Sequence, residues 1–177
     1  MRRMLDSLYL LSGALAAFFL MMIAVLIAAQ IIGRSFEVLV PSADDFARLS
    51  LAASSFLALA YTYRRGVHIR VNLLLQRFGP VNRRRAELFC ILIGTWLTGM
   101  LAWYTVDMTI EGIRWPEYTI GLIPIAKWIP QTAMSFGAIV LFIAFVDDLV
   151  VMLRGGTPAY LLSEQSADDS DRHAAYE

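Results

Sequence analysis

Four long apolar runs, separated by shorter polar segments, dominate the pattern of the chain. They lie at about residues 8–32, 45–63, 87–107 and 128–150. A helix of about 20 residues crosses the roughly 30 Å hydrocarbon layer of a bilayer, at about 1.5 Å per residue. The second run is the shortest and contains Arg48, whose side chain can extend to the interface. The pattern predicts an all-α integral membrane protein with four transmembrane helices.

The first run also resembles a signal peptide, because Arg2 and Arg3 precede it. The apolar region of a signal peptide spans about 7–15 residues. The stretch from Ser7 to Gly33 holds 27 residues without a charge, far more than that. We therefore expect an uncleaved first span.

The distribution of basic residues predicts the orientation of the four spans. Eleven of the 15 Lys and Arg residues fall on the side that holds both termini and the connection between the second and third spans. Four fall on the other side. Since Lys and Arg are enriched in cytoplasmic segments, both termini are expected in the cytoplasm.

The segments outside the spans differ in character. Residues 66–79, between the second and third spans, mix arginines with apolar residues, which predicts a basic segment lying among phospholipid head groups. The outer connection at 107–127 is too apolar for a solvated linker and should be structured. Residues 1–153 are expected to form a single membrane domain. The polar residues 154–177 should be a disordered cytoplasmic tail.

Composition agrees with a membrane protein and excludes several classes of function. The chain is 58% hydrophobic and 17% charged, against about a quarter charged in soluble domains. A net charge of zero gives no reason to expect nucleic-acid binding. The single cysteine, Cys90, excludes an intrachain disulfide framework, and we expect it to be a buried, inert thiol.

The central parts of the spans lack ionisable residues, whereas ion-coupled carriers and pumps usually carry them there. We expect no catalytic residue, no cofactor and no metal site, and thus no enzyme. Asp107 and Glu111, four residues apart, are the only weak candidate for a catalytic or redox site, and a solvated helix end explains them better. Two alternatives stay open: a self-assembling small four-span carrier, and the membrane anchor subunit of a redox enzyme.

Small residues recur at helical spacing on every predicted span, and such faces let helices approach closely in lipid. They are Gly13, Ala17, Met21, Ala24 and Ala28; Ser50, Ser54 and Ala58; Thr95, Gly99 and Ala102; Ala133 and Gly137. Packing of the four helices on one another is the favoured interpretation, and docking onto a partner is the alternative. Phe89, Trp96 and Trp103 recur every seven residues, which indicates either a lipid-facing ridge or a helix–helix contact.

Polar motifs mark the two ends of the second span. Asp45 and Arg48 lie three residues apart near its start, as expected of an acid on the helix dipole with a local ion pair. A polar contact with another subunit is the functional alternative. Arg64, Arg65, Gly66 and His68 follow its end, where a lone histidine beside arginines usually forms interfacial hydrogen bonds.

The order of these motifs resembles the small, Q-type membrane subunit of tripartite ATP-independent periplasmic (TRAP) transporters. The resemblance runs from about residue 8 to residue 153. It is carried by Asp45, Arg48, Gly66, His68, Ile69, Ile123, Pro124, Trp128, Pro130 and Gly137. The family commonly has Glu at the position of Asp45 and Asp at the position of Asn72. The second difference removes a charge.

The resemblance implies a multi-pass protein of the bacterial inner membrane, acting as the non-catalytic scaffold subunit of a sodium-coupled uptake system for carboxylate-like substrates. Its partners would be a large multi-span membrane subunit, which carries sodium and substrate, and transiently a periplasmic substrate-binding protein. The residues expected to contact a subunit or the lipid interface are Asp45, Arg48, Arg64, Arg65, Gly66, His68, Trp96, Trp103, Pro124 and Trp128.

Overall fold

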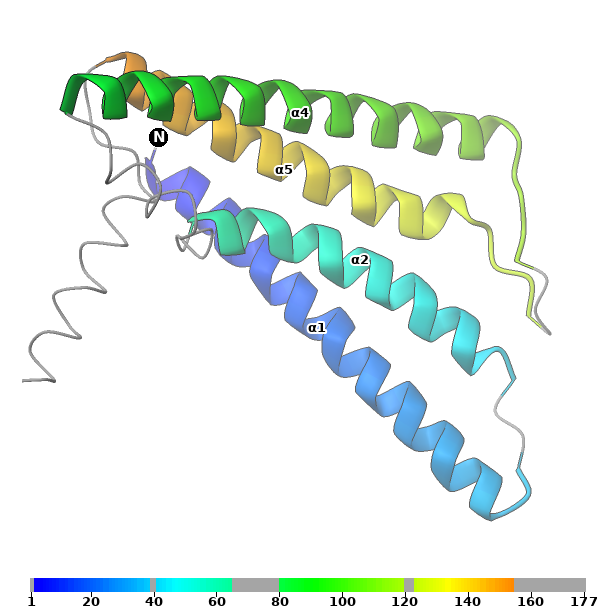
Figure 1. The fold of residues 1–177 in the computed structure, drawn as a ribbon. Coiled ribbons are helices and arrows are strands. Elements are labelled where there is room, and N and C mark those ends of the chain that lie inside the picture. The colour runs from blue at the N-terminus through cyan, green and yellow to red at the C-terminus, as the bar shows by residue number, and fades with distance from the viewer. Residues whose placement is uncertain (1, 39–40, 65–79, 120–122, 155–177) are drawn as a thin grey trace, which may run out of the picture.

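The fold consists of four long α-helices in a computed structural model, which describes residues 2–38, 41–64, 80–119 and 123–154. The helices are α1 (Arg2–Ser35), α2 (Ala43–Arg64), α4 (Pro80–Arg114) and α5 (Trp128–Leu153) (Figure 1). Each range of residues expected to span the membrane lies within one of these helices. The expected segment at 66–79 and most of the expected tail lie outside the described residues.

The helix boundaries follow local sequence chemistry. Pro80 stands at the first position of α4, where a missing N–H costs nothing. Between α1 and α2 the chain turns through Glu37 and Ser42, which adopt the left-handed conformation with φ of 55° and 56°. The carbonyl of Ser42 then accepts hydrogen bonds from the N–H groups of Asp45 and Phe46. This connection therefore reverses the chain within a few residues.

The helices lie side by side in the order α1, α2, α5, α4, so that α2 and α5 occupy the centre and α1 and α4 the flanks (Figure 1). Helices that follow one another along the chain run in opposite directions. One end of the bundle, called here the N-terminal end, holds the starts of α1 and α4 and the ends of α2 and α5. The opposite, distal end holds the α1–α2 and α4–α5 connections.

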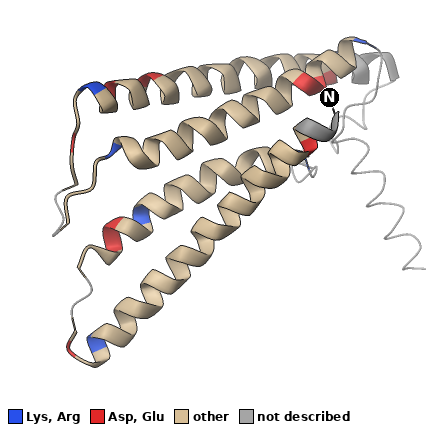
Figure 2. Cartoon of the chain, turned by 180° about the vertical axis from the view of Figure 1, so that it is seen from behind, with Lys and Arg blue, Asp and Glu red and all other residues tan. Residues whose placement is uncertain are grey.

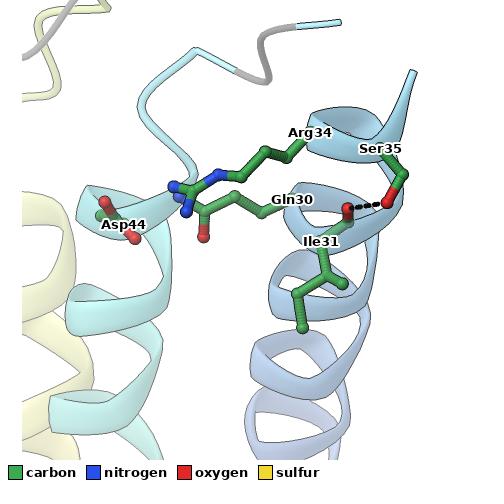
Figure 3. A pocket seen from close by; sticks show the side chains of 5 residues that line it. All are labelled: Gln30, Ile31, Arg34, Ser35 and Asp44. Atoms are coloured by element: carbon green, nitrogen blue, oxygen red, sulfur yellow. Dashed lines mark hydrogen bonds between the residues drawn. The ribbon is translucent and has the colours of Figure 1, made fainter. Parts of the chain in front are cut away.

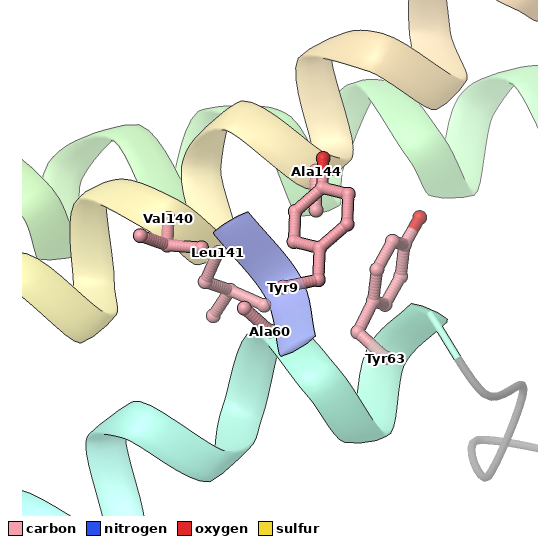
Figure 4. Close-up of a cluster of buried hydrophobic side chains, with 6 residues drawn as sticks. All are labelled: Tyr9, Ala60, Tyr63, Val140, Leu141 and Ala144. Atoms are coloured by element: carbon pink, nitrogen blue, oxygen red, sulfur yellow. The ribbon is translucent and has the colours of Figure 1, made fainter. Parts of the chain in front are cut away.

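The main buried cluster joins three helices near the N-terminal end (Figure 4). Tyr9 comes from α1, Ala60 and Tyr63 from α2, and the last members from α5: Val140, Leu141 and Ala144. The ring of Tyr63 stacks on that of Phe145, with centroids 4.1 Å apart. This cluster fixes α1 and α2 against α5 where their polar ends meet.

Hydroxyl groups link neighbouring helices by bonding to backbone carbonyls. Ser12 Oγ donates to the carbonyl of Leu57 over 2.6 Å, and Ser54 Oγ donates to that of Ala16 over 3.0 Å, which joins α1 to α2. Between α5 and α4, Ser135 Oγ lies 2.7 Å from the carbonyl of Thr105. Such bonds contribute about 0.6 kcal/mol each on average in a membrane. The polar residues of these helices thus serve the chain's own packing.

The small-residue faces of α2, α4 and α5 pack inside the bundle, as predicted. Ser50, Ser54, Ala102 and Gly137 are buried. The prediction for α1 was wrong: Ala17, Met21, Ala24 and Ala28 are exposed, and of the expected face Gly13 alone packs closely, against the ring of Tyr61. The buried side of α1 is instead the one that carries Tyr9, Ser12 and Ala16. The sequence did not distinguish these faces because α1 is apolar around its whole circumference.

Three of the described helical segments are long and apolar enough to cross a membrane: Leu5–Ser35, Arg85–Arg114 and Trp128–Leu153. Charged side chains of the described bundle gather toward the helix ends, with uncharged helix between them (Figure 2). Large apolar side chains such as Leu20 and Trp103 are 60% and 74% exposed. Because so large an apolar surface is unfavourable in water, these side chains must face lipid or another membrane protein.

Candidate functional site

Arg64 ties together three helices at the N-terminal end of the bundle. Its Nη1 donates to Oδ2 of Asp147 in α5 and its Nη2 to Oδ1 of Asp6 in α1, both over 3.2 Å. The guanidinium also lies 5.1 Å from the centre of the Tyr9 ring, within cation–π distance. Arg64, predicted to face a subunit or the lipid interface, is thus engaged by its own chain. Sequence reasoning missed both partners because they lie 58 and 83 residues away.

The start of α2 presents its basic residue to the exterior. Arg48 is exposed and Asp45 is half-buried. Among the ion pairs of the described residues, none joins these two, so the expected local ion pair is not formed. The charge of Arg48 is therefore available to a partner at this place in the fold.

The outer face of α4 carries a ridge of aromatic side chains. Phe89, Trp96 and Trp103 are 64%, 65% and 74% exposed. The opposite side of α4 packs on α5, where Gly94 and Gly99 lie against the rings of Phe145 and Phe142. The ridge therefore makes no contact among the four described helices, and we expect it to face lipid or a partner. Cys90 is also exposed, so the prediction of a buried thiol was wrong.

The outer connection between α4 and α5 is structured in its described part. Tyr118 and Ala126 form an antiparallel bridge, and the N–H of Lys127 donates to the carbonyl of Glu117 over 2.9 Å. Lys127 Nζ also donates to Glu117 Oε2 over 2.9 Å. This hydrogen bond, together with the positive charge of Lys127, holds the pKa of Glu117 below its ordinary value. The connection thus has a defined shape.

The predicted residues of this region occupy different surroundings. Pro124 is exposed, and Trp128 at the start of α5 is half-buried. The neighbouring Ile123 N–H donates to Ser42 Oγ over 2.9 Å, which links the two distal connections. Arg65, Gly66 and His68, with Asn72, lie outside the described residues.

Among the pockets that described residues line, two open at the distal end. One, of about 380 Å³, lies between α4, α5 and their connection, and its lining includes Glu111, Trp115 and Gln131. The other, of about 480 Å³, lies between the end of α1 and the start of α2 and is lined by Gln30, Ile31, Arg34, Ser35 and Asp44 (Figure 3). Sequence reasoning found neither pocket, since both depend on how two helix ends meet.

The fold and its surface define a helical membrane protein whose charged groups, in the described bundle, gather toward the helix ends and whose flanks are apolar. Residues 23–155 match the family described as the DctQ component of tripartite ATP-independent periplasmic transporters. This match covers about three quarters of the chain. The chain therefore belongs to the DctQ family, the small membrane components of TRAP transporters, and is a transporter component rather than an enzyme.

The comparison with individual curated proteins gave no match. The family assignment confirms the resemblance found in the sequence. Members of the family work with a large membrane subunit and a periplasmic binding protein.

Proposed function

We propose that this chain is the non-catalytic scaffold subunit of a sodium-coupled TRAP uptake system for carboxylate-like substrates. It supports a large membrane subunit that binds sodium and substrate, and it meets the periplasmic binding protein transiently. The observation that carries the proposal is that polar groups of the described bundle hydrogen-bond to neighbouring helices of the same chain. Span hydroxyls such as Ser12 and Ser54 bond to neighbouring helices, while the charged Arg64 cluster lies at one end.

The proposal places all four helices across the bacterial inner membrane, with both termini in the cytoplasm. The helix α2 is not among the three segments that are apolar enough to span a membrane by themselves. It lies between α1 and α5 and runs antiparallel to its chain neighbours (Figure 1). A helix held between two apolar neighbours needs less apolar surface of its own, because they shield part of it from lipid. The excess of basic residues at the N-terminal end supports this orientation.

Two surfaces are available for the large subunit. The ridge of Phe89, Trp96 and Trp103 offers apolar area on α4. Arg48 adds an exposed charge on α2. In a membrane, helix association depends on packing and on interhelical polar contacts. The two surfaces together supply both kinds of contact.

Reconstitution of uptake in proteoliposomes tests the scaffold role. The large subunit and the binding protein are assayed with this chain, without it, and with its Arg48→Glu variant, under an inward sodium gradient. We expect uptake with the wild-type chain, a strong loss without it, and reduced assembly and uptake with Arg48→Glu. Arg48→Lys, which keeps the charge, is the matched control and should retain assembly.

The same assay separates the scaffold from a carrier. Substrate uptake by proteoliposomes that contain this chain alone would contradict the proposal and favour a self-assembling carrier. Normal copurification and uptake with Arg48→Glu would remove Arg48 from the interface.

A further inference from the structure

The pocket between the end of α1 and the start of α2 brings opposite charges to one opening. Arg34 and Gln30 extend from successive turns of α1 toward Asp44 in the first turn of α2 (Figure 3). Both Arg34 and Asp44 are exposed. Among the described residues, neither side chain takes part in an ion pair. The pocket has a volume of about 480 Å³, and its lining thus includes one cationic and one anionic group that could each bind a charge of a ligand.

An apolar surface continues from this pocket along α1. Ile31 lines the pocket and is 63% exposed, and Ile27, one turn earlier, is 45% exposed. Residues four apart lie on the same face of a helix. A ligand whose polar part binds at Arg34 could therefore place an apolar part along Ile31 and Ile27, in the direction that runs along α1 away from its end.

We propose that this pocket binds the head group of a phospholipid that carries a primary amine, the chemistry of phosphatidylethanolamine. Its phosphate lies beside the Arg34 guanidinium, with the Gln30 amide as a further donor. Its ammonium group donates to the Asp44 carboxylate, and an acyl chain lies along Ile31 and Ile27. The geometry suits this head group because a cation from α1 and an anion from α2 line the same opening.

Other phospholipids satisfy only part of the pocket. Phosphatidylglycerol supplies the phosphate but no cation for Asp44. Phosphatidylcholine supplies a cation without N–H donors, so it cannot form a charge-assisted hydrogen bond with the carboxylate. This inference goes beyond the scaffold role, and it requires only that the distal end lies at a bilayer surface.

Lipid retention by the purified full chain tests the proposal. The chain is extracted from bacterial membranes that contain phosphatidylethanolamine and phosphatidylglycerol, and the bound lipids are measured by native mass spectrometry. We expect preferential retention of phosphatidylethanolamine by the wild type. Arg34→Gln should lower total retention about fivefold, and Asp44→Asn should lower the ratio of the two lipids about fivefold, as loss of one ion pair implies.

Matched controls are Arg114→Gln and Asp107→Asn, which change exposed charges of α4 outside this pocket. They should leave both quantities unchanged. Equal lipid ratios in the wild type and Asp44→Asn would overturn the proposal, and would indicate that Arg34 and Asp44 pair directly or contact a protein.

A second measurement uses the wild-type chain alone. Its melting temperature is compared in vesicles of phosphatidylglycerol mixed with either phosphatidylethanolamine or phosphatidylcholine. We expect a higher value with phosphatidylethanolamine, and equal values would refute the preference. Soluble phosphoethanolamine, added at the same concentration, should not reproduce the shift. If it does, the occupant is a free phosphate ester and not a membrane lipid.

Discussion

Gly137 of α5 lies directly against the backbone of Phe56 in α2. A Cβ atom at position 137 would lie 2.5 Å from the Phe56 carbonyl oxygen and 2.8 Å from the Leu57 nitrogen. Real Cβ contacts do not occur at such distances. The absence of a side chain at Gly137 therefore sets how closely the two central helices approach.

Gly137→Ala should force α5 away from α2, because the obstacle is backbone and cannot rotate aside. Overpacking of this kind costs about 1–3 kcal/mol. The free energy of unfolding in mixed micelles measures the effect. Gly99→Ala is the control, since its Cβ would lie 3.1 Å from the ring of Phe142, a side chain that can shift. An equal loss of stability in both variants would show that the close backbone contact is not the cause.

Arg64→Gln should loosen the N-terminal end of the bundle. It removes the hydrogen bonds to Asp6 and Asp147 and the contact with the Tyr9 ring. The side chains of Arg64 and Asp147 are 18% and 25% exposed, so solvent screens their interaction only in part. We expect a loss of about 1–2 kcal/mol in the free energy of unfolding.

A double-mutant cycle tests how much of the stability lost in Arg64→Gln comes from the contact with Asp147. Asp147→Asn should be destabilising alone but should add little to Arg64→Gln, because both remove one interaction. Asp6→Asn should cost less, since the Asp6 side chain is 59% exposed. Simple additivity of Arg64→Gln and Asp147→Asn would contradict the contact between these two side chains.

The Glu117–Lys127 pair should respond to acid. The pKa of Glu117 is lowered by the hydrogen bond from Lys127 and by its charge. A carboxyl whose folded pKa lies below its unfolded value stabilises the fold above the unfolded pKa. This contribution is lost as pH falls through the folded pKa. The pair should thus stay intact at neutral pH and break only in acid below the ordinary range of a glutamate, about pH 4.3.

NMR titration of the Glu117 carboxyl carbon checks this expectation. In the Lys127→Gln variant its pKa should return to the ordinary range of a glutamate. The same midpoint in the wild type and the variant would show that the hydrogen bond does not persist in solution. Because the side chains of Lys127 and Glu117 are 46% and 74% exposed, solvent screens the pair, and the variant should leave overall stability nearly unchanged.

The positions of the helices could be predicted from the sequence, because a long run without charges is typical of a membrane-spanning helix. The residues expected to span at 128–150 lie in α5, which starts at Trp128. The faces of α2, α4 and α5 were also predictable, because small residues such as Ser54 and Gly137 stand out among larger ones. The face of α1 was not, since Ser12 and Ala16 compete there with Ala17, Ala24 and Ala28 on a helix without a polar side.

Contacts between segments far apart in the chain could not be predicted from the sequence. Arg64 was noticed as a charge at a helix end, but its partners depend on α5 lying beside α2. The pocket of Arg34 and Asp44 likewise depends on how two helix ends diverge. In a membrane protein, hydropathy predicts where helices are, whereas shape complementarity decides which of them are neighbours.

The aromatic ridge of α4 gives the sharpest test of the partner surface. Trp96→Ala and Trp103→Ala remove side chains that are 65% and 74% exposed, so the isolated chain should keep its fold. If the large subunit covers this ridge, each change should weaken the complex at least tenfold, as loss of a central tryptophan does at interfaces. Copurification at limiting concentration measures this effect. Phe18→Ala, 61% exposed on α1 at the opposite flank, is the control.

The native Cys90 provides an independent readout on the same helix. It is exposed and is the only cysteine of the sequence, so a membrane-permeant maleimide should label the isolated chain at this one position. Labelling should slow when the large subunit is present, because a partner on α4 excludes the reagent. Unchanged labelling, together with normal copurification of Trp96→Ala and Trp103→Ala, would show that the ridge faces lipid. The partner surface would then have to be sought around Arg48 of α2.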